Sequence, residues 1–296
     1  MDVLGDALAA MRSGQQPGST RTEVRAPWGL SFDKIAGAAF HVVLQGSCWL
    51  LPSKGAPVAL GPGDVVFLRG GGRHGLADDP RTPLKVFGAG VHDGTGAQTV
   101  LLCGAYHLDL ARPHPLLQDL PEVIHLSTGV GRNAPLRAAV ELLGHELDTA
   151  GGAGVPALVD LLLLYILRAW FDDRPDSGGW ALALRDPPVR AALEAVHREP
   201  GRAWTVAELG RLGGLSRATF ARRFTEQVGR PPLAYLTWWR MTVAARRLQE
   251  NDAPVAAVAT RAGYTSEFAF ARAFKREFGI APGTYRKRLR AGANHL

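Results

Sequence analysis

The most regular pattern of apolar residues lies in the C-terminal third of the chain. Two triads with members four positions apart predict two amphipathic helices, each with one buried stripe: Phe220, Phe224 and Val228, and fifty residues later Phe270, Phe274 and Phe278. Each triad is followed directly by a glycine and, three residues later, by a proline. One helical module is therefore predicted to occur twice in tandem.

A shorter helix is predicted in front of each triad. Thr205 and Glu208 form the pattern of a capping box, and this first short helix ends near Gly213. In the second copy Pro254 suits the first helical turn, and the helix ends at Gly263. Each copy is thus predicted to be helix, tight turn, helix. The segment 233–251 between the copies has no proline or glycine and predicts a continuous helix of roughly 28 Å.

Residues 20–127 have a different pattern. Short apolar runs separated by glycine, proline and aspartate predict a small antiparallel barrel or sandwich: 39–44, 48–51, 65–68, 84–87 and 99–103. Two helical patterns follow, at 134–149 and 155–172. The chain is therefore predicted to be an α+β multidomain protein, with an N-terminal β-barrel, a helical segment and a C-terminal all-α domain.

The repeated module has the layout of a helix-turn-helix, whose second helix enters the major groove of DNA. Arg222 and Arg272 occupy the centre of the outward faces, and a guanidinium can bond guanine O6 and N7 together. The predicted DNA-binding residues lie on or beside these faces: Arg217, Ala218, Ala221, Arg222, Thr225, Glu267, Phe268, Ala271, Arg272 and Lys275. Phe268 is unusual on an outer face and is expected to contact a thymine methyl or a neighbouring helix.

The distribution of charge supports this interpretation. From residue 201 onward the chain has 17 Lys and Arg against 6 Asp and Glu, whereas residues 1–200 have 17 against 21. A single arginine is more often a solvated part of a helix face, but the regional excess of positive charge is what phosphate binding requires. An architectural protein that binds DNA without sequence preference is an alternative, and the ratio of specific to nonspecific affinity separates the two.

Residues 188–290 resemble the DNA-binding domain of AraC-type transcriptional regulators, in which a long helix joins two helix-turn-helix units. The segments that carry the resemblance include Gly263-Tyr264, Phe274–Gly279 and Pro282–Arg286. The resemblance implies that Arg222 and Arg272 are principal base-contacting residues. Ala218 and Ala221 stand where other members often have larger contact residues, so the target sequence cannot be carried over.

The N-terminal region resembles the cupin-like sensor domain of the same family. Residues 60–68 followed by Arg73-His74 resemble the second cupin motif, and His41 lies near the usual glutamate of the first. The resemblance implies four parts: a cupin-like effector-sensing domain (1–127), a helical dimerisation hairpin (128–173), a linker (174–186) and a double helix-turn-helix domain (187–296). It further implies a homodimer, an activator role, and RNA polymerase and a small-molecule effector as partners.

Four residues of the predicted barrel are candidates for an effector pocket: His41, Cys48, His74 and Cys103. Two imidazoles and two thiolates would also suit tetrahedral zinc or copper(I), and a Cys48–Cys103 pair would form a redox switch. Their spacing matches no metal signature, and a histidine or cysteine inside a barrel is more often part of the packing. Effector binding, metal binding and redox sensing therefore all stay open at this point.

Other features of the sequence argue against an enzyme, a secreted protein and a membrane protein. A cupin enzyme would need a histidine-rich first motif, which this chain lacks. Two cysteines fit a reducing cytoplasm, no signal peptide is expected, and the apolar stretch 155–171 contains Asp160 and Arg168, which disfavours a membrane span. The sequence therefore predicts a cytoplasmic, sequence-specific DNA-binding transcription regulator that is not an enzyme.

Overall fold

The computed structural model describes residues 2–11, 18–35, 37–88, 94–107, 114–127, 133–149, 153–174, 178–250 and 252–293. Contacts within the chain group it into two compact units. One unit contains the strands β1–β10 with helices α3 and α4. The other contains helices α5–α12, together with α1 (Val3–Met11) and α2 (Pro115–Gln118). The predicted boundaries at residues 127, 173 and 186 divide the chain by function. The two compact units are defined by contacts alone and do not test these boundaries, which therefore remain predictions.

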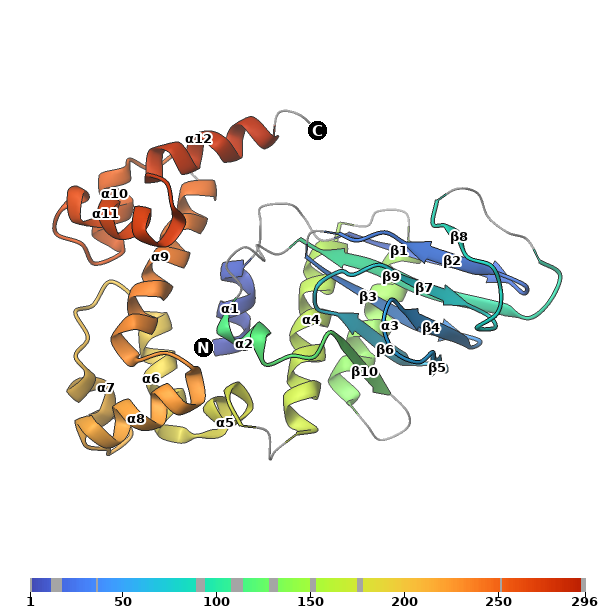
Figure 1. Ribbon diagram of the computed structural model, residues 1–296, viewed down its shortest axis with the longest axis horizontal. Helices are drawn as coiled ribbons and strands as arrows, with labels where there is room; N and C mark the ends of the chain where they lie inside the picture. Colours follow the sequence, from blue (N-terminus) through green and yellow to red (C-terminus); the bar gives the residue numbers. More distant parts are fainter. Residues whose placement is uncertain are drawn as a thin grey trace. The chain divides into compact units, whose positions relative to one another are not determined.

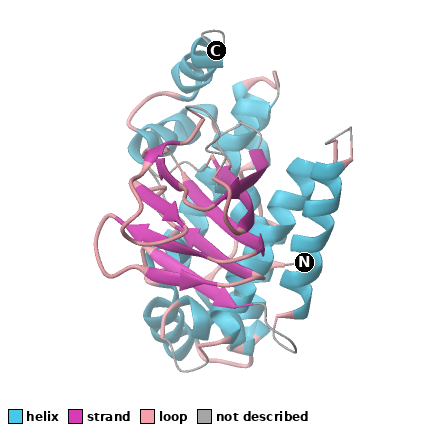
Figure 2. Cartoon of the chain, turned by 90° about the vertical axis from the view of Figure 1, so that its right-hand side faces the viewer, coloured by secondary structure: helices cyan, strands magenta, loops and turns pink. Residues whose placement is uncertain are grey.

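The strands form two five-stranded sheets (Figure 1; magenta in Figure 2). The first sheet is antiparallel throughout, in the order β1 (Gly18–Arg25), β9 (Gln98–Tyr106), β3 (Ala38–Gln45), β6 (Asp64–Leu68) and β10 (Val123–Ser127). The second has the order β5 (Val58–Leu60), β4 (Cys48–Pro52), β7 (His74–Ala77), β2 (Gly29–Phe32) and β8 (Lys85–Val86). Only the β2–β8 pair among these described strands is parallel.

These strands do not close into a barrel. In the described part of the chain, β1 and β10 are the two edges of one sheet, and β5 and β8 are the edges of the other. Buried residues of both sheets share one core, among them Leu101 and Val66 from the first and Leu50 and Leu76 from the second. The predicted closed barrel is therefore not observed. Alternation of apolar residues could not decide this point, because sandwiches and barrels both bury one face of each strand.

Helices α3 (Ala134–Asp148) and α4 (Val155–Asp172) pack against each other, where the apolar pattern predicts two helices. Helix α4 also contacts β1 and β10. The hydroxyl of Tyr106 on β9 donates a hydrogen bond of 2.7 Å to the carbonyl oxygen of Val159. The helical pair thus belongs to the same unit as the sheets.

The second unit contains the two helical modules. The first is α7 (Val206–Leu212) with α8 (Arg217–Val228), the second is α10 (Val255–Arg261) with α11 (Glu267–Phe278), and the long helix α9 (Pro232–Glu250) runs between them (Figure 1). Helices α6 (Pro187–Arg198) and α12 (Pro282–Ala293) complete the bundle. Both phenylalanine pairs of the predicted stripes, Phe220 with Phe224 and Phe270 with Phe274, have no exposed surface. The stripes therefore belong to the core as predicted, with Val228 also buried and Phe278 at the end of the second stripe only half-buried.

Helix α5 (Trp180–Arg185) lies within the segment 174–186, which is predicted to be a linker. Its Trp180 is buried, and the indole ring packs edge-on against the imidazole of His114 with the ring centres 4.8 Å apart. The surrounding glycine, serine and proline residues concealed this helix. A helix of six residues is too short to be stable alone, so burial of the tryptophan stabilises it.

A buried polar chain joins four segments of this unit. Nδ1 of His114 accepts a hydrogen bond from the backbone N–H of Leu116, so its Nε2 carries the proton and points to the Tyr235 hydroxyl 3.3 Å away. That hydroxyl lies 2.7 Å from Nε2 of His197 and donates to it, which leaves the protonated Nδ1 of His197 facing Asp6 at 3.5 Å. Side chains of α1, α6 and α9 and of the segment before α2 are thereby connected.

Candidate nucleic-acid interface and ligand cavity

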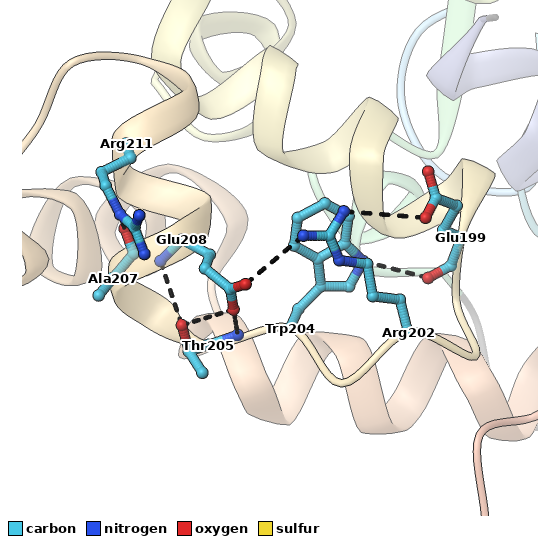
Figure 3. A network of polar contacts seen from close by, with 7 residues as sticks. All are labelled: Glu199, Arg202, Trp204, Thr205, Ala207, Glu208 and Arg211. Carbon is cyan, nitrogen blue, oxygen red and sulfur yellow. Dashed lines mark hydrogen bonds and ion pairs between the residues drawn. The ribbon is translucent and has the colours of Figure 1, made fainter.

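The first short helix, α7, is built as its sequence predicts. The backbone N–H of Glu208 donates to the Thr205 hydroxyl at 3.2 Å, and the Glu208 carboxylate accepts the N–H of Thr205 at 2.9 Å (Figure 3). These two hydrogen bonds are the capping box, and the bonds from Thr205 lower the pKa of Glu208. Gly214, in the turn that follows, has φ +68°, which a residue with a side chain adopts only with strain.

Residues next to the capping box extend the same network. The guanidinium of Arg202 lies 3.9 Å from the centre of the Trp204 ring and 3.5 Å from the Glu208 carboxylate (Figure 3). The indole N–H of Trp204 donates to the backbone carbonyl of Glu199 at 3.1 Å. The start of α7 is thus connected to the end of α6, which fixes where the first module begins.

Helix α8 is attached to α6 through Asp186, the residue before Pro187. The Asp186 side chain is buried, and its Oδ2 accepts a 2.6 Å hydrogen bond from the Gln227 amide and a second bond from the guanidinium of Arg223. A buried carboxylate with charge-assisted hydrogen bonds holds its partners in one geometry. This contact sets the orientation of α8 within the unit, and no local pattern predicts it, because Asp186 and Gln227 are 41 residues apart.

All the residues predicted to bind DNA lie on α8 and α11. Seven are exposed: Arg217, Ala218, Arg222, Glu267, Phe268, Arg272 and Lys275. The other three, Ala221, Thr225 and Ala271, are half-buried. Phe268 is 73% exposed, the largest value among the exposed large apolar residues described. Each helix therefore presents an accessible face centred on its arginine, opposite the buried phenylalanine stripe.

The two faces differ in the partners of the central arginine. Arg222 forms an ion pair with Glu226, with Nη1 and Oε1 3.1 Å apart. The guanidinium of Arg272 instead lies 6.0 Å from the centre of the Phe268 ring. Residue 276, which corresponds to Glu226, is an arginine. Glu226 was not identified from the sequence, although its position one turn beyond Arg222 is visible there.

The strand-containing unit has a cavity of about 350 Å³. Of the four predicted pocket residues, His41, His74 and Cys103 line the cavity, and Cys48 does not. Phe32, Val86 and Phe87, which are not among the predicted pocket residues, also line the cavity. Phe32 and His41 belong to different sheets and Phe87 lies 46 positions beyond His41, so the packing of the two sheets brings these side chains together.

His41 on β3 and His74 on β7 meet from different sheets, with their Nε2 atoms 2.6 Å apart. Burial lowers the pKa of His41 well below its usual value, and the neighbouring His74 lowers it further. Burial also lowers the pKa of His74, against a smaller opposing effect of its hydrogen bond to Gly72. Both imidazoles are therefore neutral at pH 7 and share one proton between the facing nitrogens.

The cysteines do not join this pair in a metal site. No group of three or more metal-ligating side chains is found among the residues that the structure describes. Burial raises the pKa of Cys48 to about 12 and raises the pKa of Cys103 as well, so both stay protonated thiols. Both belong to the apolar core. The predicted zinc, copper or redox site is therefore not supported, since both thiols pack as small apolar groups.

Known proteins resemble the chain over its two regions. The model of the cupin family matches residues 2–172, and the model of a helix-turn-helix domain matches residues 209–288. A protein of Streptomyces antibioticus described as an AraC-like transcription regulator is 34% identical over 300 residues, which cover 97% of this chain and 99% of that protein. An AraC-like transcription regulator of Streptomyces lividans is 33% identical, covering 97% and 98%.

Two further relatives extend the comparison. The RCS-specific HTH-type transcriptional activator RclR of Escherichia coli is 31% identical, with 85% of this chain and 84% of that protein covered. The solved DNA-binding domain of AdpA, in complex with a target DNA, is 34% identical over 36% of this chain and 95% of its own, with a TM-score of 0.34.

A cupin domain followed by two tandem helix-turn-helix modules defines a DNA-binding transcription regulator. The chain belongs to the AraC-like transcription regulators, as the identity over its whole length shows. None of the described helices has the length and apolar character needed to cross a membrane.

Proposed function

We propose that this regulator reads a specific DNA sequence through the exposed faces of α8 and α11. The observation that carries the proposal is the exposure of Arg222 and Arg272 at the centre of two matched faces, each on the second helix of its module. Arginine is the residue that most often bonds guanine in the major groove. Helix α9, between the modules, has 19 residues and a length of about 28 Å, near the roughly 34 Å of one DNA turn.

The proposal is tested by selecting a target from random DNA with the wild-type protein and then measuring the affinity of variants for it. Arg222→Ala and Arg272→Ala should each cost about 1–3 kcal/mol at that target and relax the base preference at one position. Arg137→Ala is the matched control, because Arg137 forms a similar ion pair on α3, with Glu141 at 3.8 Å. If a substitution instead lowers the affinity for all DNA sequences equally, the arginine contacts phosphate, and its assignment to base recognition is contradicted.

The regulator is further proposed to respond to a small molecule. The cupin domain binds a small-molecule effector in the cavity beside His41, and the bound effector changes the affinity for DNA or for RNA polymerase. The activator role rests on the Escherichia coli relative, which is described as an activator. In vitro transcription from a promoter carrying the selected target tests this role, and repression there would contradict it.

A homodimer is proposed to form through α3 and α4. Leu142 on α3 is 54% exposed, on the helix that packs against α4. The proposal rests on the resemblance to AraC-type regulators, in which such helices pair the subunits, and Leu142 is the exposed apolar side chain of α3 that a second copy would bury. Leu142→Glu should convert the dimer to a monomer in analytical ultracentrifugation, while Arg137→Glu on the same helix, a change of charge without loss of apolar surface, should not. A wild-type monomer would contradict the proposal.

A further inference from the structure

The cavity in the strand-containing unit has a chemical character that limits what it can hold. Its volume of about 350 Å³ lies in the range of small-molecule sites. We propose that its ligand is a neutral, mainly apolar molecule with one O–H or N–H donor, such as an alkylphenol, and that Nδ1 of His41 accepts the hydrogen bond from that donor. This inference rests on the proposed function, in which the cupin domain binds an effector.

The positions of the protons in the histidine pair identify the acceptor. Nδ1 of His74 lies 2.7 Å from the carbonyl oxygen of Gly72, and a carbonyl only accepts, so this Nδ1 carries the proton. Nε2 of neutral His74 is then a lone pair, and Nε2 of His41, 2.6 Å away, must donate to it. Neutral His41 therefore has its remaining lone pair on Nδ1.

That lone pair has no hydrogen-bond partner among the described residues, although Nδ1 of His41 is buried. A buried acceptor without a donor is unfavourable, and a ligand that supplies the donor removes the penalty. His41 is only 3% exposed and lines the cavity. Because Nδ1 itself has almost no accessible surface, the donor reaches it only after the side chains beside His41 move aside, and it then completes a chain from the ligand through His41 and His74 to the Gly72 carbonyl.

The remaining lining favours an apolar, ring-shaped body. The Phe32 ring stacks on His74 with centres 5.0 Å apart and planes 7° apart, and Phe87 stacks on Phe32 at 5.0 Å and 27°. Val86 and Phe87, which also line the cavity, are 57% and 37% exposed. A ligand with an aromatic ring would cover these residues and extend the stack.

The charges around the cavity disfavour an anion. No lysine or arginine is among the described residues that line the cavity, and the single charged one is Asp33. Its carboxylate lies 3.1 Å from Arg73, so it is already paired. A carboxylate ligand would therefore be buried without a fixed cation, and an ammonium ligand would find no free anion. A neutral donor has neither cost.

The test uses the full-length protein and three probes of similar size at pH 7.5: 4-ethylphenol, 1-ethyl-4-fluorobenzene and 4-ethylbenzoate. Isothermal titration should give the phenol at least about tenfold tighter binding than the fluoro compound, because only the phenol pairs the buried acceptor. The benzoate should bind least tightly. Equal binding of phenol and fluoro compound, tightest binding of the benzoate, or no binding of the phenol at millimolar concentration would each overturn the inference.

Variants of His41 test whether this side chain accepts the hydrogen bond from the ligand. His41→Phe should reduce the preference for the phenol over the fluoro compound to about onefold, and His41→Gln, whose amide oxygen still accepts, should keep part of it. His125→Phe is the control, since His125 bonds Asp64 at 3.1 Å and does not line the cavity. An unchanged preference in His41→Phe contradicts the role of His41. If that variant does not fold, the three wild-type titrations decide alone.

DNA binding measured in the presence of small molecules distinguishes failure of this inference from failure of the proposed function. If DNA binding at the selected target responds to other small molecules but the phenol is not bound, only the ligand class is wrong. If DNA binding responds to no small molecule in a broad library, the effector role itself fails, whatever the titrations show.

Discussion

The guanidinium of Arg222 and the carboxylate of Glu226 lie 3.1 Å apart on successive turns of α8, with both side chains more than half exposed. The arginine expected to read DNA in the first module is thus already paired within the free protein. Its counterpart Arg272 has Arg276 at the equivalent position one turn on. The two modules therefore differ in the electrostatic state of their central residue before DNA is bound.

Glu226→Gln should strengthen DNA binding, because Arg222 no longer has to leave an ion pair and one negative charge is removed beside the phosphates. An exposed pair contributes about 0.2–1 kcal/mol, so the gain should be about 1.4- to fivefold at low salt and smaller at high salt. Fluorescence anisotropy on the selected target measures it. Glu141→Gln, which breaks the similar pair on α3, should leave affinity unchanged; weaker binding of Glu226→Gln would mean that Glu226 orients Arg222 for reading.

Asp186→Ala should destabilise the helical unit. The change leaves the Gln227 amide without its 2.6 Å acceptor and removes the anion that Arg223 contacts, at a cost of about 1–3 kcal/mol. Urea unfolding followed by circular dichroism checks the value. Asp79→Ala, at a surface carboxylate bonded only to exposed Arg81, should cost much less. DNA affinity should fall as well, since α8 loses the contact that orients it.

Thr205→Ala should shorten or loosen α7, because it removes the acceptor for the Glu208 N–H at 3.2 Å. Loss of such a cap costs about 1 kcal/mol. Thr205→Ser keeps the hydroxyl and should retain most of the stability measured by urea unfolding. Equal loss in both variants would assign the effect to the methyl group instead.

Stability should fall as the solution is acidified through the histidine range. Burial lowers the pKa of His114 well below its usual value, and it lowers the pKa of His197 against the opposing effect of Asp6. The unfolded chain binds protons at these histidines below about pH 6.5, while the folded unit does not, so unfolding is favoured there. The free energy of unfolding should be highest above pH 6.5 and should drop toward pH 5, by at most about 1.4 kcal/mol per pH unit for each histidine.

Urea unfolding at pH 7.5 and 5.5 measures this dependence. His114→Phe, which has no proton to gain, should reduce the difference between the two pH values even if it changes the absolute stability. His125→Phe, at a partly exposed histidine, is the control. A wild-type stability that is constant over this range would contradict the neutral, buried state of these histidines.

Much of the fold of the DNA-binding half could be predicted, because the sequence patterns that specify it involve residues close together in the chain. The phenylalanine stripes, the capping box and the turn glycines all act between residues a few positions apart, so the sequence alone specifies helix, turn and helix, and therefore which face of α8 and α11 is exposed. Strand β1 (Gly18–Arg25) has a single buried apolar side chain, Val24, so no local pattern predicts it, and its pairing with β9 is a long-range contact.

The sequence by itself thus determined the two tandem modules, the position of Arg222 and Arg272 at their centres, and the excess of positive charge around them. The tertiary structure decided that His41 and His74 meet across two sheets, that Cys48 lies in the core and outside the cavity, and that Asp186 holds α8. Helical periodicity depends on neighbours within a turn or two, whereas the approach of side chains from different strands and helices depends on how whole elements pack.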